Sequence, residues 1–347
     1  MRDVTVSGLG KTFGAQPVLA GLNPDVPAGS LTAILGPSGS GKTTLLRLLA
    51  GFDRADTGTI GIGGVVVDGP GAYLPPERRR IGYVPQEGSL FPHLTVAGNV
   101  GFGLPAGQRR GGKVDALLET VGLGGFGRRY PHQLSGGQQR VALARALAIE
   151  PAVVLLDEPF ASLDAHLRAS VRADVQEIFR RAGTTAVLVT HDQDEALSVA
   201  DRVAALRDGS IAQCAPPEDL YCRPADPRLA SFIGEANLLE GVVSGATVKT
   251  LLGALPLDPA AAIPGAAGQV TVLIRPEQID IVPNEDGLTA HVTSYRYHGH
   301  DAVLYAQPED DAGASPVVVR ITGGPHRPVG SGVTLRARGP VFAWPAD

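Results

Sequence analysis

A glycine-rich segment near the N-terminus has the residue types and spacing of a phosphate-binding loop. It stands between a short apolar run typical of a β-strand, Leu31–Leu35, and a strong helix-forming run, Leu45–Ala50. Glycines let the backbone point its N–H groups inward at the start of a helix, which creates an anion site. We expect the Lys42 ammonium to contact the β- and γ-phosphates of a nucleotide, and the Thr43 hydroxyl to coordinate Mg²⁺. The residues expected to bind phosphate are Gly36, Pro37, Ser38, Gly39, Ser40, Gly41, Lys42, Thr43 and Thr44.

Two adjacent carboxylates, Asp157 and Glu158, end a continuous apolar run, Val153–Leu156. Such a run is typical of a parallel strand buried on both faces, and open α/β sheets bind ligands at the carboxyl ends of their strands. Because two nearby negative charges raise each other's pKa, the pair makes chemical sense only when its members do different work. We expect Asp157 to hold Mg²⁺ through water and Glu158 to polarise the attacking water.

A second glycine-rich segment, Leu134–Arg140, precedes another helical pattern with apolar residues on one face. Two interpretations fit the residues. Ser135 and Gln138 have the spacing of a capping box, which requires no ligand. Alternatively, Gly136 and Gly137 expose helix N–H groups to a second phosphate. One nucleotide does not need two phosphate-binding segments in one chain. The second segment would therefore bind the nucleotide of a partner subunit in a head-to-tail dimer.

Length and composition suggest a protein of two domains. The chain has 347 residues, and its 30 basic and 35 acidic side chains give a net charge of −5. This charge argues against a nucleic-acid partner, and the two cysteines, Cys214 and Cys222, suggest neither a disulfide framework nor a zinc site. No apolar run reaches the roughly 18 residues that span a membrane, and the first residues lack the apolar core of a signal peptide. We therefore expect a soluble intracellular protein.

The pattern of the sequence changes near Gly234–Asn237. Residues 1–234 alternate helical periodicities with short apolar runs and carry 23 basic and 23 acidic residues, as expected of an α/β domain. Residues 235–347 carry 7 basic and 12 acidic residues and contain short β-type segments separated by turn residues, as in a small all-β barrel or sandwich. The expected strands are Glu240–Val243, Val270–Ile274, Thr289–Tyr297, Ala302–Ala306, Val317–Ile321 and Val333–Ala337.

Taken together and in this order, these motifs resemble the ATP-binding subunit of an ATP-binding-cassette (ABC) transporter. Residues 36–43 resemble Walker A, Leu134–Gln138 the LSGGQ signature and Val153–Glu158 Walker B. Gln86 resembles the Q-loop glutamine, Asp164 the D-loop aspartate and His191 the switch histidine, although a histidine after an apolar run such as Ala186–Thr190 is ordinary by itself. The resemblance implies a P-loop NTPase of the α/β class, with a RecA-like core and a helical subdomain at about residues 87–150.

The resemblance also implies roles for individual residues. Gln86 would sense the γ-phosphate, Mg²⁺ and the membrane subunit, and His191 would contact the γ-phosphate and help hold the attacking water. In an ATP-dependent head-to-tail homodimer, the signature residues Ser135, Gly136, Gly137 and Gln138 would complete the partner's nucleotide site, with Ser135 and Gly137 on its γ-phosphate. Asp164 would cross the interface between the two copies.

Two further features follow from the resemblance. Phe13 stands where a tyrosine or tryptophan more commonly stacks on adenine, and Val18 would line the same pocket. The apolar segment Ser89–Val96 could be ordinary core, but in the family it forms the groove for a coupling helix of the transmembrane permease. A peripheral location on the cytoplasmic face of the membrane follows, together with indirect dependence on a periplasmic or lipid-anchored solute-binding protein.

The tail, residues 235–347, resembles the β-rich, OB-like regulatory (TOBE) domain of importer ATPases, and Arg275–Gln278 resembles its recurrent Arg-Pro-Glu element. Residues 75–88 and Leu90–Val96 are most similar to the branch that imports ferric iron. Polyamine, sugar, sulfate and thiamine remain alternative cargoes, because this subunit need never touch the cargo. A soluble ABC ATPase that takes no part in transport is disfavoured by the single cassette and the lack of sustained heptads.

Overall fold

The computed structural model describes residues 2–86, 89–109, 112–134, 137–161, 163, 165–261, 267–283, 287–310, 313–323 and 326–346. The chain forms two compact units, Met1–Glu218 and Asp219–Asp347. The division therefore lies earlier in the chain than Gly234–Asn237, where the sequence pattern changes. No helix among the described residues is long and apolar enough to cross a membrane.

The centre of the first unit is a six-stranded sheet in the order β12-β11-β4-β10-β9-β8, in which only β12 runs antiparallel to its neighbour. Strands β4, β9 and β10 are almost entirely buried, as their continuous apolar runs require. The expected strands at residues 31–35 and 153–156 are confirmed. The strands are β4 (Leu31–Leu35), β8 (Ile81–Val84), β9 (Val153–Asp157), β10 (Thr185–Thr190), β11 (Arg202–Arg207) and β12 (Ser210–Ala215).

A second, antiparallel sheet covers the first helix of the unit. Helix α1 (Lys42–Ala50) packs between the two sheets, so that its four leucines are at most 2% exposed. This burial on nearly all sides holds the helix that follows the glycine-rich loop in one position. The antiparallel strands are β1 (Val4–Phe13), β2 (Gln16–Leu22), β3 (Asp25–Val26), β5 (Thr57–Ile62), β6 (Val65–Gly69) and β7 (Ala72–Tyr73).

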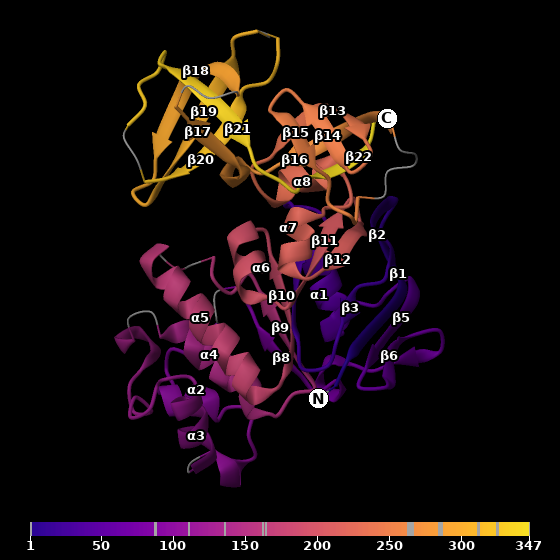
Figure 1. The fold of residues 1–347 in the computed structure, drawn as a ribbon. Coiled ribbons are helices and arrows are strands. Elements are labelled where there is room, and N and C mark those ends of the chain that lie inside the picture. The colour runs from indigo at the N-terminus through magenta and orange to yellow at the C-terminus, as the bar shows by residue number, and fades with distance from the viewer. Residues whose placement is uncertain are drawn as a thin grey trace. The chain divides into compact units, whose positions relative to one another are not determined.

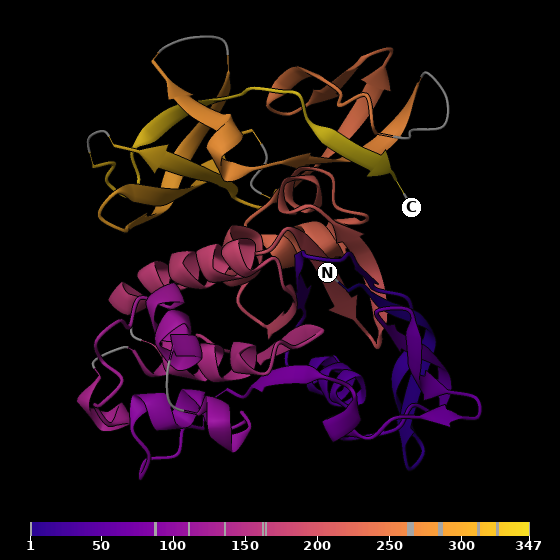
Figure 2. The same cartoon turned by 90° about the horizontal axis from the view of Figure 1, so that it is seen from below.

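The remaining helices of the first unit gather mainly on the side away from the antiparallel sheet. Figure 1 shows α2–α5 on one side of the unit and β1, β2, β5 and β6 on the other, and Figure 2 shows the same separation from below. The segment at residues 87–150 holds α2, α3 and α4. The helices are α2 (Val96–Val100), α3 (Gly112–Thr120), α4 (Gln138–Ala148), α5 (Ala165–Ala182) and α6 (Gln193–Val199), with 3₁₀ turns at Pro76–Arg78, Ala106–Gln108 and Pro131–Gln133.

The start of α4 bears on one of the two interpretations of the second glycine-rich segment. The capping-box interpretation required Ser135 at the N-cap, but the helix begins at Gln138 with Gly137 as its N-cap and with no side-chain cap. Ser135 and Gly136 lie outside the described residues. Because glycine offers no side chain to cap with, the first N–H groups of α4 receive no bond from the capping residue.

The second unit contains two five-stranded antiparallel sheets that share one apolar core. All six strands expected from the sequence are confirmed, and the sequence missed the short strands β14, β15, β17 and β22. Helix α7 (Pro217–Cys222) crosses the division between the units, and α8 (Pro227–Ile233) belongs to the second. The strands are β13 (Asn237–Ser244), β14 (Thr247–Thr250), β15 (Gly253–Pro256), β16 (Ala267–Ile274), β17 (Ile279–Val282), β18 (Leu288–Tyr297), β19 (Asp301–Pro308), β20 (Val317–Thr322), β21 (Gly332–Ala337) and β22 (Phe342–Pro345).

One buried arginine explains why residues 219–234 fold with the β-rich unit. Arg275 is 3% exposed, and its guanidinium donates hydrogen bonds to the carbonyl oxygens of Tyr221, Ala230, Gly234 and Glu235 at 2.7–3.3 Å. It also lies 4.0 Å from the centroid of the Tyr221 ring. Burial lowers its pKa, but arginine stays charged. A change of sequence pattern cannot reveal such a set of contacts.

We predict that Arg275→Met lowers the free energy of unfolding of the second unit by at least about 2 kcal/mol, because several buried carbonyl groups lose their donor. The chain has a single tryptophan, Trp344, whose indole donates to Pro224 O at 3.0 Å within this unit. Urea unfolding followed by its fluorescence therefore reports on this unit. Arg228→Met, at an exposed position of α8, is the control, and equal midpoints for the two variants would contradict the prediction.

Candidate functional site

Four neighbouring strands of the parallel sheet deliver the expected site residues to one edge. Strand β4 leads into the glycine-rich loop, β10 into His191, β9 into Asp157 and Glu158, and β8 toward Gln86. The register pairs Thr190 with Leu35 and Val189 with Asp157, so the strand ends are level. The loops that follow them must therefore meet at the carboxyl edge, where open α/β sheets bind ligands.

The glycine-rich loop has positions that only glycine can occupy. A Cβ atom on Gly36 would lie 2.5 Å from Leu206 O, and one on Gly41 would lie 2.5 Å from Leu19 Cδ2. Gly41 also has a φ of +103°, in the region that favours glycine. The Ser40 hydroxyl is buried and has no hydrogen-bond partner among the described residues. A narrow loop with a free buried donor at the start of α1 fits an anionic group such as phosphate.

Lys42 lies inside this loop. Its side chain is buried, and its Nζ donates hydrogen bonds to Gly36 O at 2.7 Å and Pro37 O at 2.9 Å. Burial lowers the pKa of Lys42, while the negative charges of Glu158 and Asp157 raise it. The loop thus holds the Lys42 ammonium close enough to Asp157 and Glu158 for an electrostatic interaction with both carboxylates.

Glu158 contacts two other residues expected from the sequence. Its Oε1 lies 2.9 Å from His191 Nδ1, and its Oε2 accepts a bond of 3.4 Å from Gln86 Nε2. The backbone of Glu158 is left-handed, with a φ of +43°, and its N–H donates to Val189 O at 2.9 Å. Non-glycine residues in this region are uncommon and strained, and such strain is concentrated at functional sites. The turn directs the carboxylate toward His191 and Gln86.

The segment that follows His191 is braced by polar contacts. Asp192 caps α6 by accepting from Glu195 N at 3.0 Å, and it pairs with Arg172 at 3.2 Å. The Thr190 hydroxyl donates to the buried Glu195 carboxylate at 2.5 Å. Burial raises the pKa of Glu195. These contacts fix the backbone on both sides of His191, whose own side chain is about half exposed.

Asp157 has a partner that the sequence analysis missed. The Tyr83 hydroxyl donates to Asp157 Oδ2 at 2.9 Å, and its ring packs edge-on against Phe52. Burial and the neighbouring Asp157 charge raise the pKa of Tyr83, so the phenol stays protonated as a donor. A signal was present in the sequence: a tyrosine within the apolar strand β8 needs a partner for its hydroxyl.

The donor set at this edge suits a hard divalent cation. The Asp157 carboxylate, the Thr43 hydroxyl and the Gln86 amide all supply oxygen, which is the ligand type that Mg²⁺ prefers. Among the described residues, Tyr83 bonds the Asp157 carboxylate at Oδ2, so Oδ1 is available to a metal ion or its water. The residues expected to hold Mg²⁺ therefore have fitting chemistry.

The remaining expected residues lie as follows. Val18 packs against the glycine-rich loop, since a Cβ on Gly41 would lie 3.0 Å from Val18 O and 3.3 Å from Val18 Cγ1. Phe13 lies at the end of the same hairpin with half of its surface exposed. Gly137 is buried and Gln138 exposed at the start of α4. Ser135, Gly136 and Asp164 lie outside the described residues.

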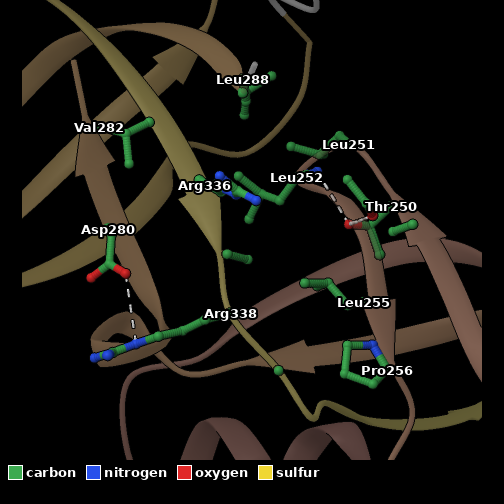
Figure 3. A pocket seen from close by; sticks show the side chains of 15 residues that line it. Thr250, Leu251, Leu252, Leu255, Pro256, Asp280, Val282, Leu288, Arg336 and Arg338 are labelled. Carbon is green, nitrogen blue, oxygen red and sulfur yellow. Dashed lines mark hydrogen bonds and ion pairs between the residues drawn. The ribbon is translucent and has the colours of Figure 1, made fainter. Parts of the chain in front are cut away.

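A cavity of about 1190 Å³ in the second unit is a competing location for a ligand (Figure 3). Its lining mixes apolar side chains with polar and charged ones, and Arg338 at its edge is engaged with Asp280 at 3.7 Å and with Glu277 O at 3.0 Å. Arg336 reaches the cavity from β21. The described residues that line it lack the grouping of lysine, adjacent acids and histidine that occurs at the sheet edge, so the candidate site stays in the first unit.

Comparisons with known proteins show the family of the chain. Residues 19–161 match the family model described as ABC transporter. The chain is 47% identical over 345 residues to "Fe(3+) ions import ATP-binding protein FbpC 1" of Rhodococcus jostii (strain RHA1), covering 98% of each chain. It is 43% identical over 358 residues to "Fe(3+) ions import ATP-binding protein FbpC" of Mesorhizobium japonicum, again covering 98% of each.

A solved structure supports the fold. The cbiO1 protein of Clostridium perfringens, described as part of the ABC transporter complex cbiONQ, is similar with a TM-score of 0.58 and 29% sequence identity. The match covers 64% of this chain and 91% of that protein. With relatives of more than 40% identity along almost its whole length, this chain belongs to the ATP-binding proteins of the ABC transporter family.

Proposed function

We propose that this chain is the ATP-hydrolysing subunit of an importer of ferric iron. The observation that carries the catalytic part is the contact of Glu158 with both His191 and Gln86 beside the Lys42 loop. The cargo is inferred from relatives that span 98% of the chain and whose names specify Fe(3+) import. Polyamine, sugar, sulfate and thiamine are less supported as cargoes, because none of these relatives is named for them.

In this proposal the glycine-rich loop binds the phosphates of ATP through its N–H groups and the Lys42 ammonium. Thr43, Asp157 and Gln86 would hold Mg²⁺, which neutralises charge on the β- and γ-phosphates. Phosphoryl transfer needs positioning and charge neutralisation more than covalent chemistry. The buried helix α1 and the contact between Tyr83 and Asp157 support this role because they fix both groups before substrate binds.

Glu158 is the proposed general base. Its carboxylate orients a water for in-line attack and accepts that water's proton. His191 Nδ1 holds the carboxylate at 2.9 Å, which leaves Nε2 as the ring atom that contacts the γ-phosphate. Gln86 links the same carboxylate to the segment that precedes the helical subdomain, so a movement of that segment would reach the site directly.

The proposal includes a second copy of the chain. Each signature segment, with Ser135, Gly136, Gly137 and Gln138, would complete the partner's ATP site, and Asp164 would cross the interface. The start of α4 supports this arrangement, because its N-cap is a glycine, which has no side chain to bond the first N–H groups of the helix. ATP then stabilises the closed dimer and hydrolysis releases it, which provides a two-state element for transport.

An aromatic surface on the helical subdomain is the proposed docking site for the permease, at the cytoplasmic face of the membrane. Phe91 and Phe102 have ring centroids 4.3 Å apart, and Arg145 lies 5.6 Å from the Phe91 centroid. Phe102 is 52% exposed, which is unusual for a phenylalanine in a packed pair and fits an interface. A solute-binding protein would act on this chain only through the permease.

We predict that Glu158→Gln retains ATP affinity but lowers ATP turnover by roughly 10²- to 10⁴-fold, because the amide cannot accept the proton. Nucleotide titration and single-turnover hydrolysis with purified protein measure the two effects. Light scattering with saturating ATP and Mg²⁺ should show accumulation of the dimer. Glu240→Gln, on a strand of the second unit, is the control. Turnover within about threefold of the parent would remove Glu158 from the role of base.

We also predict that Tyr83→Phe raises the Mg²⁺ concentration for half-maximal ATPase activity by about tenfold, because hydrogen bonds to a metal-ligating carboxylate tune metal affinity. Activity at saturating Mg²⁺ should change much less. Tyr73→Phe is a matched control, since its hydroxyl donates to Gly51 O at 2.8 Å, away from Asp157. An unchanged Mg²⁺ dependence in Tyr83→Phe would show that this hydroxyl does not orient the metal ligand.

Finally, we predict that Phe102→Asp prevents co-purification with the permease, because a carboxylate cannot be buried unpaired in an apolar interface. The measurement is affinity capture of the tagged permease subunits co-expressed with the variant. Val65→Asp, on a similarly exposed residue of the antiparallel sheet, controls for the added charge. Undiminished capture of Phe102→Asp would place the docking surface elsewhere.

A further inference from the structure

The end of the hairpin that carries Phe13 is held weakly by its own ladder. The pairing of β1 with β2 shifts register on both sides of Lys11. Beyond the shifts, Thr12 lies opposite Pro17, which has no N–H to donate. Strand pairing alone therefore leaves this end of the hairpin free to bend. Further along the hairpin, Val18 packs against the glycine-rich loop.

Asp56, which directly precedes β5, supplies the missing contacts. Its Oδ2 accepts from Thr12 N at 2.7 Å, its Oδ1 accepts from Lys11 Nζ at 2.9 Å, and its own N–H donates to Gly10 O at 3.0 Å. The bonds from Lys11 and Thr12 lower the pKa of Asp56, so the carboxylate is ionised near neutral pH. Asp56 thus holds the three consecutive residues directly before Phe13, two through its carboxylate and one through its backbone N–H.

The contact continues from Lys11 to the aromatic ring. The Lys11 ammonium lies 5.3 Å from the centroid of the Phe13 ring, within the range of a cation–π interaction. Asp56 fixes this ammonium, and the Lys11 side chain is only 15% exposed. Phe13 itself is 50% exposed. The ring is therefore braced by a fixed cation while part of its surface stays open to a ligand.

We propose that Asp56 is a positioning residue that orients Phe13 to receive the base of the bound nucleotide. The inference rests on the proposed ATPase function and on stacking of Phe13 on adenine. A ring held in place before binding loses less conformational entropy when the base arrives, and this strengthens binding. Asp56 touches neither the phosphates nor the reacting atoms in this proposal, so its effect depends on the presence of a base.

The test compares a ligand that has a base with one that lacks it. Binding of ATP and of inorganic tripolyphosphate, both with Mg²⁺, is measured by calorimetry on the full chain and on variants. We expect Phe13→Ala to weaken ATP binding about tenfold and Asp56→Ala about three- to tenfold, while tripolyphosphate affinity changes less than about twofold. The double variant should bind ATP no more weakly than Phe13→Ala alone, because both changes remove the same interaction.

Asp53→Asn is the matched control, since Asp53 lies in the same loop but pairs with Arg47 at 2.6 Å. It should leave both affinities unchanged. Equal weakening of ATP and tripolyphosphate in Asp56→Ala would make Asp56 a structural residue and overturn the proposal, as would unchanged ATP affinity. If Phe13→Ala itself left ATP affinity intact, the stacking would be wrong. Failure of the parent chain to bind ATP would instead refute the proposed function.

Discussion

The register of the parallel sheet is the constraint on which the candidate site depends. Because β4, β10, β9 and β8 run in one direction with level ends, the loops that follow them must meet at one edge. Segments 120 residues apart along the chain, such as the glycine-rich loop and the turn after β9, thereby become neighbours. The burial of α1 between two sheets then prevents the loop from moving away from that edge.

Asp157 and Glu158 are adjacent in the sequence, and two neighbouring negative charges are unfavourable unless each has its own partners. Asp157 ends β9 in strand geometry, and its carboxylate receives the Tyr83 hydroxyl. Glu158 turns into the left-handed region, and its carboxylate receives His191 and Gln86 instead. The strained turn thus separates the two charges and gives each its own hydrogen-bond donors. Different partners are the physical basis for different roles, and sequence adjacency alone could not establish them.

The sequence predicted those parts of the fold that local patterns encode. Continuous apolar runs marked β4 and β9, and alternating segments marked six strands of the second unit. Short strands such as β14 and β15 were missed because four residues carry too little periodicity. The compact units divide at residue 218, earlier than the change of sequence pattern near residue 234, for a different reason. Residues 219–234 resemble their predecessors in composition, but the Arg275 guanidinium binds their carbonyl groups from 41 to 54 residues away.

The same distinction separates the predicted site residues from the missed ones. Lys42, Asp157, Glu158 and His191 follow strand ends, where motif spacing carries information. The Tyr83 hydroxyl bonds Asp157, 74 residues away, and the Asp56 carboxylate bonds Thr12, 44 residues away. The residues next to Tyr83 and Asp56 in the sequence do not indicate these partners. These contacts form because the bulged hairpin leaves the N–H of Thr12 without a partner in the strand ladder, and the end of β9 leaves the Asp157 carboxylate without one. Both polar groups need a hydrogen-bond partner. Residues that hold the predicted site residues in place are therefore found from unsatisfied donors and acceptors in the fold, rather than from motifs.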